Sequence, residues 1–354
     1  MMVLKEIILS NFRNFERRSF DFSPNLTLII GNNSRGKTTL LESIYLIIAG
    51  VGFREEKEEE LISFGKDELS AVANFSKGKE KYSFQIKIIR RKDLTQKVFF
   101  IDKTPQKYTK YRADFPGVVL FTPEQIYTIT GPPSARRDYF NHQLSRHDLE
   151  YKKHLTNYDS ALRKRNKVLE KHVESISLKD ELVFWNDYLE KEARYITNKR
   201  QLYVDFLNSN RKLDSKEFSI IYMKNEFNGK RLAEVIEKER ILRRTLIGPQ
   251  KDDFRILVGN GNDKEQKDVD LFGSRSEERL AIFWLKINEL KFYELKKIKP
   301  ILLLDDIFSE LDETNQKIIL ELIKKYQTVT TTTETKIKNL VKLSDDGFYH
   351  TINL

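Results

Sequence analysis

The sequence contains no cysteine among its 354 residues. This absence excludes a disulfide framework and a zinc site with cysteine ligands. No apolar run approaches the roughly 18 residues that a membrane-spanning helix needs, and the first residues are too short an apolar stretch for a signal peptide. These features favour a cytoplasmic protein.

The charge balance is basic, with 63 Lys and Arg residues against 53 Asp and Glu residues and a net charge of +10. A basic balance favours an anionic partner, and nucleic acid is the commonest large one. Lysine that serves only solubility explains the same balance, so charge alone leaves DNA binding open. The length allows two domains, or one domain with an insertion.

A segment near the start matches the P-loop pattern, with Gly31, Gly36, Lys37 and Thr38 at its fixed positions. The apolar run 26–30 precedes it and apolar residues at helical spacing follow it, which predicts a strand, a loop and a helix. Backbone N–H groups and the helix dipole suit phosphates. Lys37 is expected to reach the β and γ phosphates and Thr38 to bind Mg²⁺. The predicted nucleotide-binding residues are Gly31, Asn32, Asn33, Ser34, Arg35, Gly36, Lys37, Thr38 and Thr39.

A second half-site lies near the end, where the apolar run 301–304 ends in Asp305 and Asp306. A buried strand delivers Asp305 at its tip, where a carboxylate holds the hydration shell of Mg²⁺. Asp306 is placed to orient or deprotonate an attacking water. Taken alone, two aspartates after a strand also fit a solvated turn, and the P-loop favours the catalytic interpretation.

Between these half-sites, a predicted helix opens with Ser274, Arg275, Ser276 and Glu277. Ser-containing loops at helix starts bind anions through N–H groups and the helix dipole. Ser274 and Glu277 also fit a capping box, which is a purely structural role. The two interpretations are compatible, because a capped helix start still has room for a phosphate from another molecule.

Strand-like segments predict an α/β domain at residues 1–130 and 246–354. The pattern of residues 131–245 predicts a mostly helical arm. Basic clusters in both parts are candidate DNA contacts, although charge runs are usually solvated faces. The candidates are Lys87, Arg90, Arg91 and Lys92 in the first part, and Arg163, Lys164, Arg165 and Lys167 in the arm.

Together these residues resemble the ABC-type ATPases of the SMC and RecF group, and the RecF family most closely. Further blocks that carry the resemblance lie at residues 9–15, at Arg54 with 60–65, and at 121–124, 131–137 and 248–253. In that family, the segment 274–277 would be the signature, Asp305 and Asp306 the Walker B acids, and residues 309–312 the D-loop, with Asp312 at the nucleotide.

The resemblance implies an ABC-type P-loop ATPase head with a mixed sheet and helices, joined to a mostly helical second lobe. It implies ATP and Mg²⁺ as cofactors and a homodimer that closes on two ATP molecules. It also implies binding of DNA at single-strand gaps and stalled forks, with RecR and RecO as partners in RecA loading after DNA damage. Slow ATP hydrolysis would be the release switch.

Four positions depart from the family pattern. Ser34 and Ser276 stand where glycine is usual, Gln250 replaces a histidine, and Asn141 replaces an aspartate. Glycine suits loops that approach a ligand or adopt positive φ, so serine is expected to alter nucleotide affinity. Two alternatives stay open: a DNA-binding scaffold in which ATP orders a dimer without hydrolysis, and a related ATPase of a phage-defence pathway.

Overall fold

The computed structural model describes residues 2–54, 57–92, 94–113, 115–171, 176–260, 266–310, 313–332 and 349–354. The chain forms two compact units, Met1–Glu124 with Glu289–Leu354, and Gln125–Asn288. The sequence predicts a return to the first domain at residue 246, whereas the structure keeps residues 246–288 in the second unit. The reason is strand pairing, because β11 (Asp253–Gly259) pairs antiparallel with β10 (Lys216–Met223).

A five-stranded parallel sheet carries the two predicted half-sites in the first unit. Its strand order is β15-β3-β14-β13-β8. The bounds are β3 Leu26–Ile30, β8 Val118–Phe121, β13 Ile301–Asp305, β14 Thr328–Thr332 and β15 Tyr349–Asn353. Strands β3 and β13 lie where the apolar runs 26–30 and 301–304 predict them. Parallel strands end at a common edge, so the segments after β3 and β13 meet there, with β14 between them.

Helix α1 (Lys37–Ala49) follows β3 and contacts strands of both sheets of the unit. Its apolar residues join a core that extends through both sheets. Most residues of α1 are buried, so packing fixes the position of its first turn, which directly follows the loop after β3. Helix α10 spans Glu313–Lys325.

The second sheet of the unit is antiparallel and has the order β2-β1-β4-β5-β6-β7. Alternation of buried and exposed residues along β4 and β5 follows the period of two expected for a half-buried strand. Packed rings of Phe75, Phe84, Tyr111 and Phe115 fill its inner face. Bounds are β1 Val3–Phe12, β2 Phe15–Asp21, β4 Glu68–Lys77, β5 Glu80–Arg91, β6 Leu94–Ile101, β7 Thr104–Gln106 and α2 Tyr108–Ala113.

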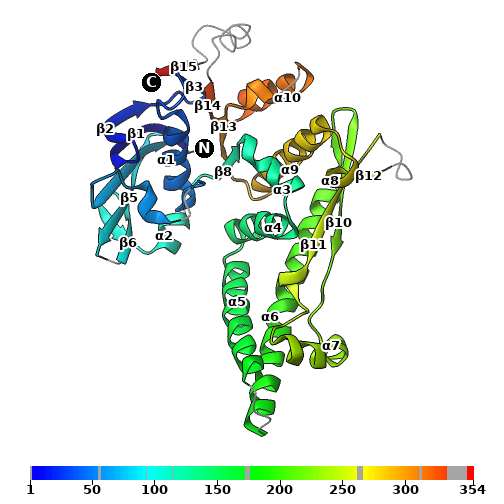
Figure 1. The fold of residues 1–354 in the computed structure, drawn as a ribbon. Coiled ribbons are helices and arrows are strands. Elements are labelled where there is room, and N and C mark those ends of the chain that lie inside the picture. Colours follow the sequence, from blue (N-terminus) through cyan, green and yellow to red (C-terminus); the bar gives the residue numbers. More distant parts are fainter. Residues whose placement is uncertain are drawn as a thin grey trace. The chain divides into compact units, whose positions relative to one another are not determined.

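The second unit combines long helices with a small sheet of order β12-β11-β10-β9. Helices α5 and α6 lie side by side, as Figure 1 shows. Of the helices in these ranges, none combines the length and apolar character that a membrane crossing requires. Helix bounds are α3 Tyr127–Thr130, α4 Pro133–His147, α5 Leu149–Glu170, α6 Ile176–Asn208, α7 Gly229–Leu242, α8 Val269–Phe272 and α9 Arg275–Leu295, and strand bounds are β9 Lys212–Leu213 and β12 Lys267–Asp268.

Candidate nucleotide site

The predicted P-loop connects β3 to α1, and Lys37 is its central cation. The Lys37 ammonium donates to the carbonyl oxygens of Gly31 at 2.7 Å and Asn32 at 3.1 Å, and the residue is buried. Gly36 has φ +99°, and a Cβ there would lie 2.7 Å from the Asn14 amide and the Phe15 ring. Glycine is therefore required at Gly36 by both backbone conformation and space.

Ser34, which occupies a family glycine position, has φ 65°. A residue with a Cβ in this left-handed region costs roughly 1 kcal/mol or more relative to glycine. Its exposed side chain explains why a small residue is tolerated. The left-handed backbone at position 34 is the physical reason why glycine is usual there, and Ser34 adopts the same backbone conformation.

The end of β13 places Asp305 against the start of α1. The Thr38 hydroxyl donates to Asp305 Oδ1 at 3.1 Å, and the Thr331 hydroxyl of β14 donates to the same oxygen at 2.6 Å. Burial raises the pKa of Asp305, and these two hydrogen bonds oppose that shift. The Asp306 N–H donates to Thr331 Oγ1 at 2.9 Å, and Asp306 has φ 49°. The two halves of the predicted site therefore meet.

A cavity of about 550 Å³ lies over this junction. Its walls include the P-loop, both aspartates and three side chains absent from the predicted site: Arg13, Arg54 and Glu124. The volume lies within the range of small-molecule and cofactor sites. Its lining is dominated by cations, hydroxyls and carboxylates, which suits a charged ligand with a metal ion better than an apolar one.

The two arginines of the cavity share one buried carboxylate. Glu42 on α1 is fully buried and accepts hydrogen bonds from both Arg13 and Arg54, the latter at 2.6 Å. Arg54 also lies 3.4 Å from the Thr39 hydroxyl. The pair adds two oriented cations beside Lys37. Both arginines lie in sequence blocks of the family, but only the tertiary contacts to Glu42 place them at the site.

The donor set at the junction fits magnesium. Mg²⁺ is typically bound through one or two protein oxygens, with phosphates and water completing the octahedron. Asp305 and the Thr38 hydroxyl supply such oxygens. Within the described ranges, no group of three or more His, Asp or Glu side chains converges on one point.

The predicted signature segment begins α9 in the second unit, and the capping box is confirmed. The Ser274 N–H donates to Glu277 Oε2 at 2.8 Å, and the Glu277 N–H donates to Ser274 Oγ at 3.3 Å. Burial would raise the pKa of Glu277, but Lys267 and Ser274 outweigh it and lower that pKa to about 2. Arg275 and Ser276 are exposed. Asp312 of the predicted D-loop lies outside the described residues.

The predicted DNA contacts divide into exposed and buried residues. Arg163, Lys164 and Lys167 are exposed on α5, and Arg91 and Lys92 are exposed at the end of β5 and the turn after it. Lys87 packs over the Phe100 ring, and Arg90 pairs with Asp67. Arg165 was wrongly predicted: it is fully buried, and its guanidinium donates to Glu239 at 2.6 Å and to Thr245 at 2.7 Å. That side chain is inaccessible to DNA.

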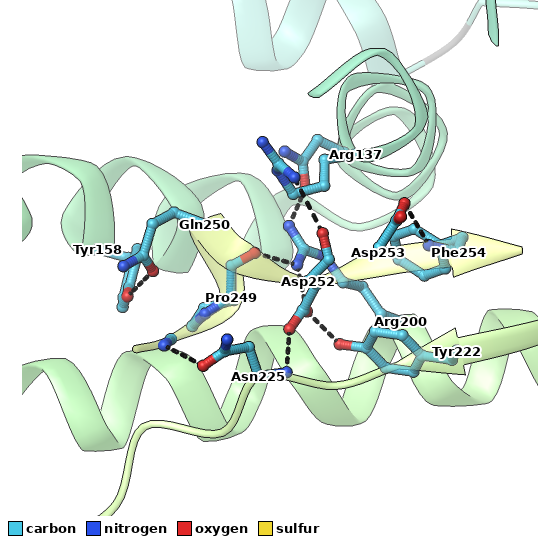
Figure 2. A network of polar contacts seen from close by, with 12 residues as sticks. Arg137, Tyr158, Arg200, Tyr222, Asn225, Pro249, Gln250, Asp252, Asp253 and Phe254 are labelled. Carbon is cyan, nitrogen blue, oxygen red and sulfur yellow. Dashed lines mark hydrogen bonds and ion pairs between the residues drawn. The ribbon is translucent and has the colours of Figure 1, made fainter. Parts of the chain in front are cut away.

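Two of the sequence blocks meet in a buried polar network of the second unit, which Figure 2 shows. The Arg137 guanidinium donates to the Asp252 carbonyl at 2.9 Å, and Arg136 pairs with Asp253 at 2.8 Å. Asp252 is fully buried and accepts from Arg200 at 2.6 Å and from the Asn225 N–H at 2.7 Å. These contacts tie the start of α4 to the turn before β11.

The remaining departures from the family pattern also lie in this network. Asn141 Oδ1 accepts from the Tyr151 hydroxyl at 2.7 Å and from Arg200 at 2.8 Å. Gln250 accepts a hydrogen bond from the Tyr158 hydroxyl and donates to the Ile247 carbonyl at 2.8 Å. Both side-chain amides therefore have hydrogen-bond partners within the network.

Fold and cavity together define an ABC-type P-loop ATPase head. The model of the RecF/RecN/SMC N terminal domain family matches residues 3–345. The DNA replication and repair protein RecF of Lachnoclostridium phytofermentans is 31% identical over 344 residues, which cover 94% of this chain and 93% of that protein.

Two solved structures of the recombination mediator protein RecF in the RecFOR pathway are also similar. The RecF-ATP structure has a TM-score of 0.82 and 29% identity, covering 94% of this chain and 92% of its own. The RecF-ATPrS structure has a TM-score of 0.83 and 28% identity, covering 100% and 96%. The chain belongs to the RecF/RecN/SMC family, and within it to the RecF group.

Proposed function

We propose that this chain is a cytoplasmic DNA-repair protein that binds ATP with Mg²⁺, dimerises on it and binds DNA at single-strand gaps and stalled forks. The observation that carries the proposal is the convergence of Lys37, Thr38 and Asp305 around one cavity of the first unit. The similarity to RecF-ATP over 94% of the chain supports ATP as the ligand.

In this proposal the P-loop N–H groups and Lys37 bind the phosphates. To do so, the Lys37 ammonium exchanges its two loop carbonyls for phosphate oxygens. Thr38 and Asp305 would hold magnesium, which would supply positive charge that neutralises the phosphates. Asp306 orients or deprotonates the attacking water. Arg13 and Arg54, fixed by Glu42, place further positive charge at the ligand.

The exposed start of α9 supplies the second half of the site. Ser274 and the neighbouring N–H groups of one protomer close on the γ phosphate held by the P-loop of its partner, with Asp312 nearby. Two nucleotides are then enclosed in a dimer that binds DNA. Slow hydrolysis removes the γ phosphate contact and opens the dimer, which is a population switch. Through RecR and RecO, DNA-bound dimers help to load RecA during the SOS response.

A second candidate is a scaffold in which ATP orders the dimer without hydrolysis. Serine at the signature position 276, where glycine is usual, favours it. Phosphate release in the presence of gapped DNA separates the two functions. The hydrolytic switch requires Asp306→Asn to lower the rate strongly, whereas equal release by the wild type and this variant supports the scaffold.

DNA binding itself is tested by fluorescence anisotropy with a labelled gapped duplex. Because contacts go mainly to phosphates, the affinity should fall steeply with salt. Addition of ATP and Mg²⁺ should raise the affinity for the wild type and not for Lys37→Ala. Equal binding by the two proteins with and without ATP would show that the nucleotide does not control DNA binding.

A further inference from the structure

Phe64 is the most exposed large apolar residue of the described chain, with a relative exposure of 105%. It lies in a turn in which the Lys66 N–H donates to the Ser63 carbonyl at 3.0 Å. Gly65 follows it with φ +75°. Burial of a phenyl ring contributes about 2 kcal/mol to the stability of a fold, and the exposed ring of Phe64 makes no such contribution.

The turn that carries Phe64 is firmly anchored. The Ser63 N–H donates to the Asn11 carbonyl at 2.9 Å, and Ile62 forms a β-bridge with Phe12. On the other side, the Arg90 guanidinium donates to the Lys66 carbonyl at 3.0 Å. The ring therefore projects from a support tied to both β1 and β5, and little ordering of the backbone is needed when a ligand binds.

Basic residues lie near the turn, where β1 and β5 end and β4 begins. The Arg90 N–H donates to the Asp67 carbonyl at 2.8 Å, which brings the end of β5 beside the segment that follows the turn. Arg91 and Lys92 continue from Arg90 and are exposed. Two acidic residues here have basic partners: Asp67 lies 3.2 Å from Arg90, and Glu16 lies 3.5 Å from Lys66. Glu60 and Glu68 are also exposed at this end of the sheet.

We propose that Phe64 is a stacking platform for an unpaired base of DNA, with Arg90, Arg91 and Lys92 contacting the adjoining phosphates. An exposed aromatic ring beside basic side chains is the combination by which proteins bind single-stranded nucleic acid. A ligand that is flat and apolar on one part and anionic on the next matches both features. The inference rests on the proposed DNA binding, and it specifies the part of the protein that holds the unpaired bases.

The platform is also joined to the nucleotide cavity through Arg13. The Arg13 N–H donates to the Leu61 carbonyl at 2.8 Å, just before the turn. Its guanidinium donates to the Glu60 carbonyl at 3.4 Å and to Glu42 at 2.9 Å, at the wall of the cavity. Arg13 therefore links the segment just before the turn to the wall of the nucleotide cavity.

The test uses the full-length protein with ATP and Mg²⁺ and a gapped duplex that carries 2-aminopurine among its unpaired bases. Phe64→Ala should weaken binding of the gapped DNA about 5- to 100-fold, the loss expected for one stacked base, and should abolish the quenching of 2-aminopurine. Phe64→Trp should retain both. Binding to a fully paired duplex should change less than twofold, and the melting temperature should not change, because the ring is exposed.

Leu295→Ala is the matched control, because Leu295 is an exposed apolar residue of the same unit with a relative exposure of 68%. It should bind as the wild type does. If Phe64→Ala binds and quenches like the wild type, the stacking inference is wrong while DNA binding stands; that is also the result expected if a protein partner covers Phe64. If the wild type binds no DNA under any condition, the proposed function fails, and the inference fails with it.

Discussion

The Thr38 hydroxyl donates a 3.1 Å hydrogen bond to the Asp305 carboxylate, although 267 residues separate the two in sequence. Thr331 on the intervening strand donates to the same oxygen at 2.6 Å. Two oxygen donors suited to magnesium are thus assembled before a nucleotide binds. A site held in place by the sheet avoids much of the ordering cost of binding.

Thr38→Ala should weaken ATP binding at least about 10-fold when Mg²⁺ is present, a loss seen even when only the partner of a metal ligand is removed. It should have little effect when Mg²⁺ is replaced by EDTA, because phosphate contacts to the loop remain. Isothermal titration in both buffers measures this difference. Thr38→Ser keeps the hydroxyl and should bind like the wild type; equal losses in both buffers would contradict the metal role.

Ser34→Gly should stabilise the nucleotide-free protein by up to about 1 kcal/mol, because glycine adopts the observed φ of 65° without the Cβ clash. The greater freedom of glycine in the unfolded chain reduces the gain. Urea denaturation measures it. Ser34→Ala keeps the strained Cβ and serves as the control. A glycine variant less stable than the alanine variant would show that the left-handed backbone is not strained.

Asp252→Ala should lower the free energy of unfolding by about 3–5 kcal/mol, because it leaves Arg200 buried with an uncompensated charge. Thermal and urea denaturation measure this loss of stability. Glu150→Gln is the control: it breaks an exposed pair with Lys153 and should cost less than about 1 kcal/mol. Similar small losses in both variants would mean that the network of Figure 2 contributes little stability.

Glu277→Gln should lower stability at pH 7 by about 2 kcal/mol, because Glu277 accepts hydrogen bonds as a carboxylate from Ser274 and Lys267. Its pKa of about 2 lies below that of an unfolded glutamate, so the carboxylate stabilises the fold above about pH 4.5. That contribution is lost as the pH falls towards 2. The difference between wild type and variant should therefore shrink over this range.

Urea denaturation at several pH values follows this difference. Glu321→Gln, which alters an exposed pair with Lys324, is the matched control and should track the wild type throughout. A difference between wild type and Glu277→Gln that grows as the pH falls would reverse the sign of the expected linkage.

Local patterns were enough to predict strands β3 and β13, the P-loop and Asp305, because each combines a short spacing with a distinct run of apolar residues. The parallel pairing of these strands in one sheet was not predicted. They did not reveal that Glu42 joins Arg13 to Arg54, since tertiary contacts alone bring these three together. The α/β unit boundary was misplaced for a similar reason: the pairing of β11 with β10 is not visible as a change in composition.

The error at Arg165 had an available signal. On α5 the buried residues Tyr158, Ala161, Arg165 and Val168 recur at spacings of three and four. Helical periodicity therefore places Arg165 on the buried face, whereas its neighbours Arg163, Lys164 and Lys167 face solvent. A run of basic residues on a helix should be divided by face before it is interpreted as a binding surface.

In the proposed function, ATP and Mg²⁺ at the junction of Lys37, Thr38 and Asp305 close two protomers into a dimer. Multi-angle light scattering of the wild type and of Lys37→Ala, with and without ATP and Mg²⁺, tests it most directly. We predict a monomer of 41.9 kDa without nucleotide, a dimer of the wild type with both ligands, and a monomeric Lys37→Ala throughout. A wild type that stays monomeric under every condition would contradict the account.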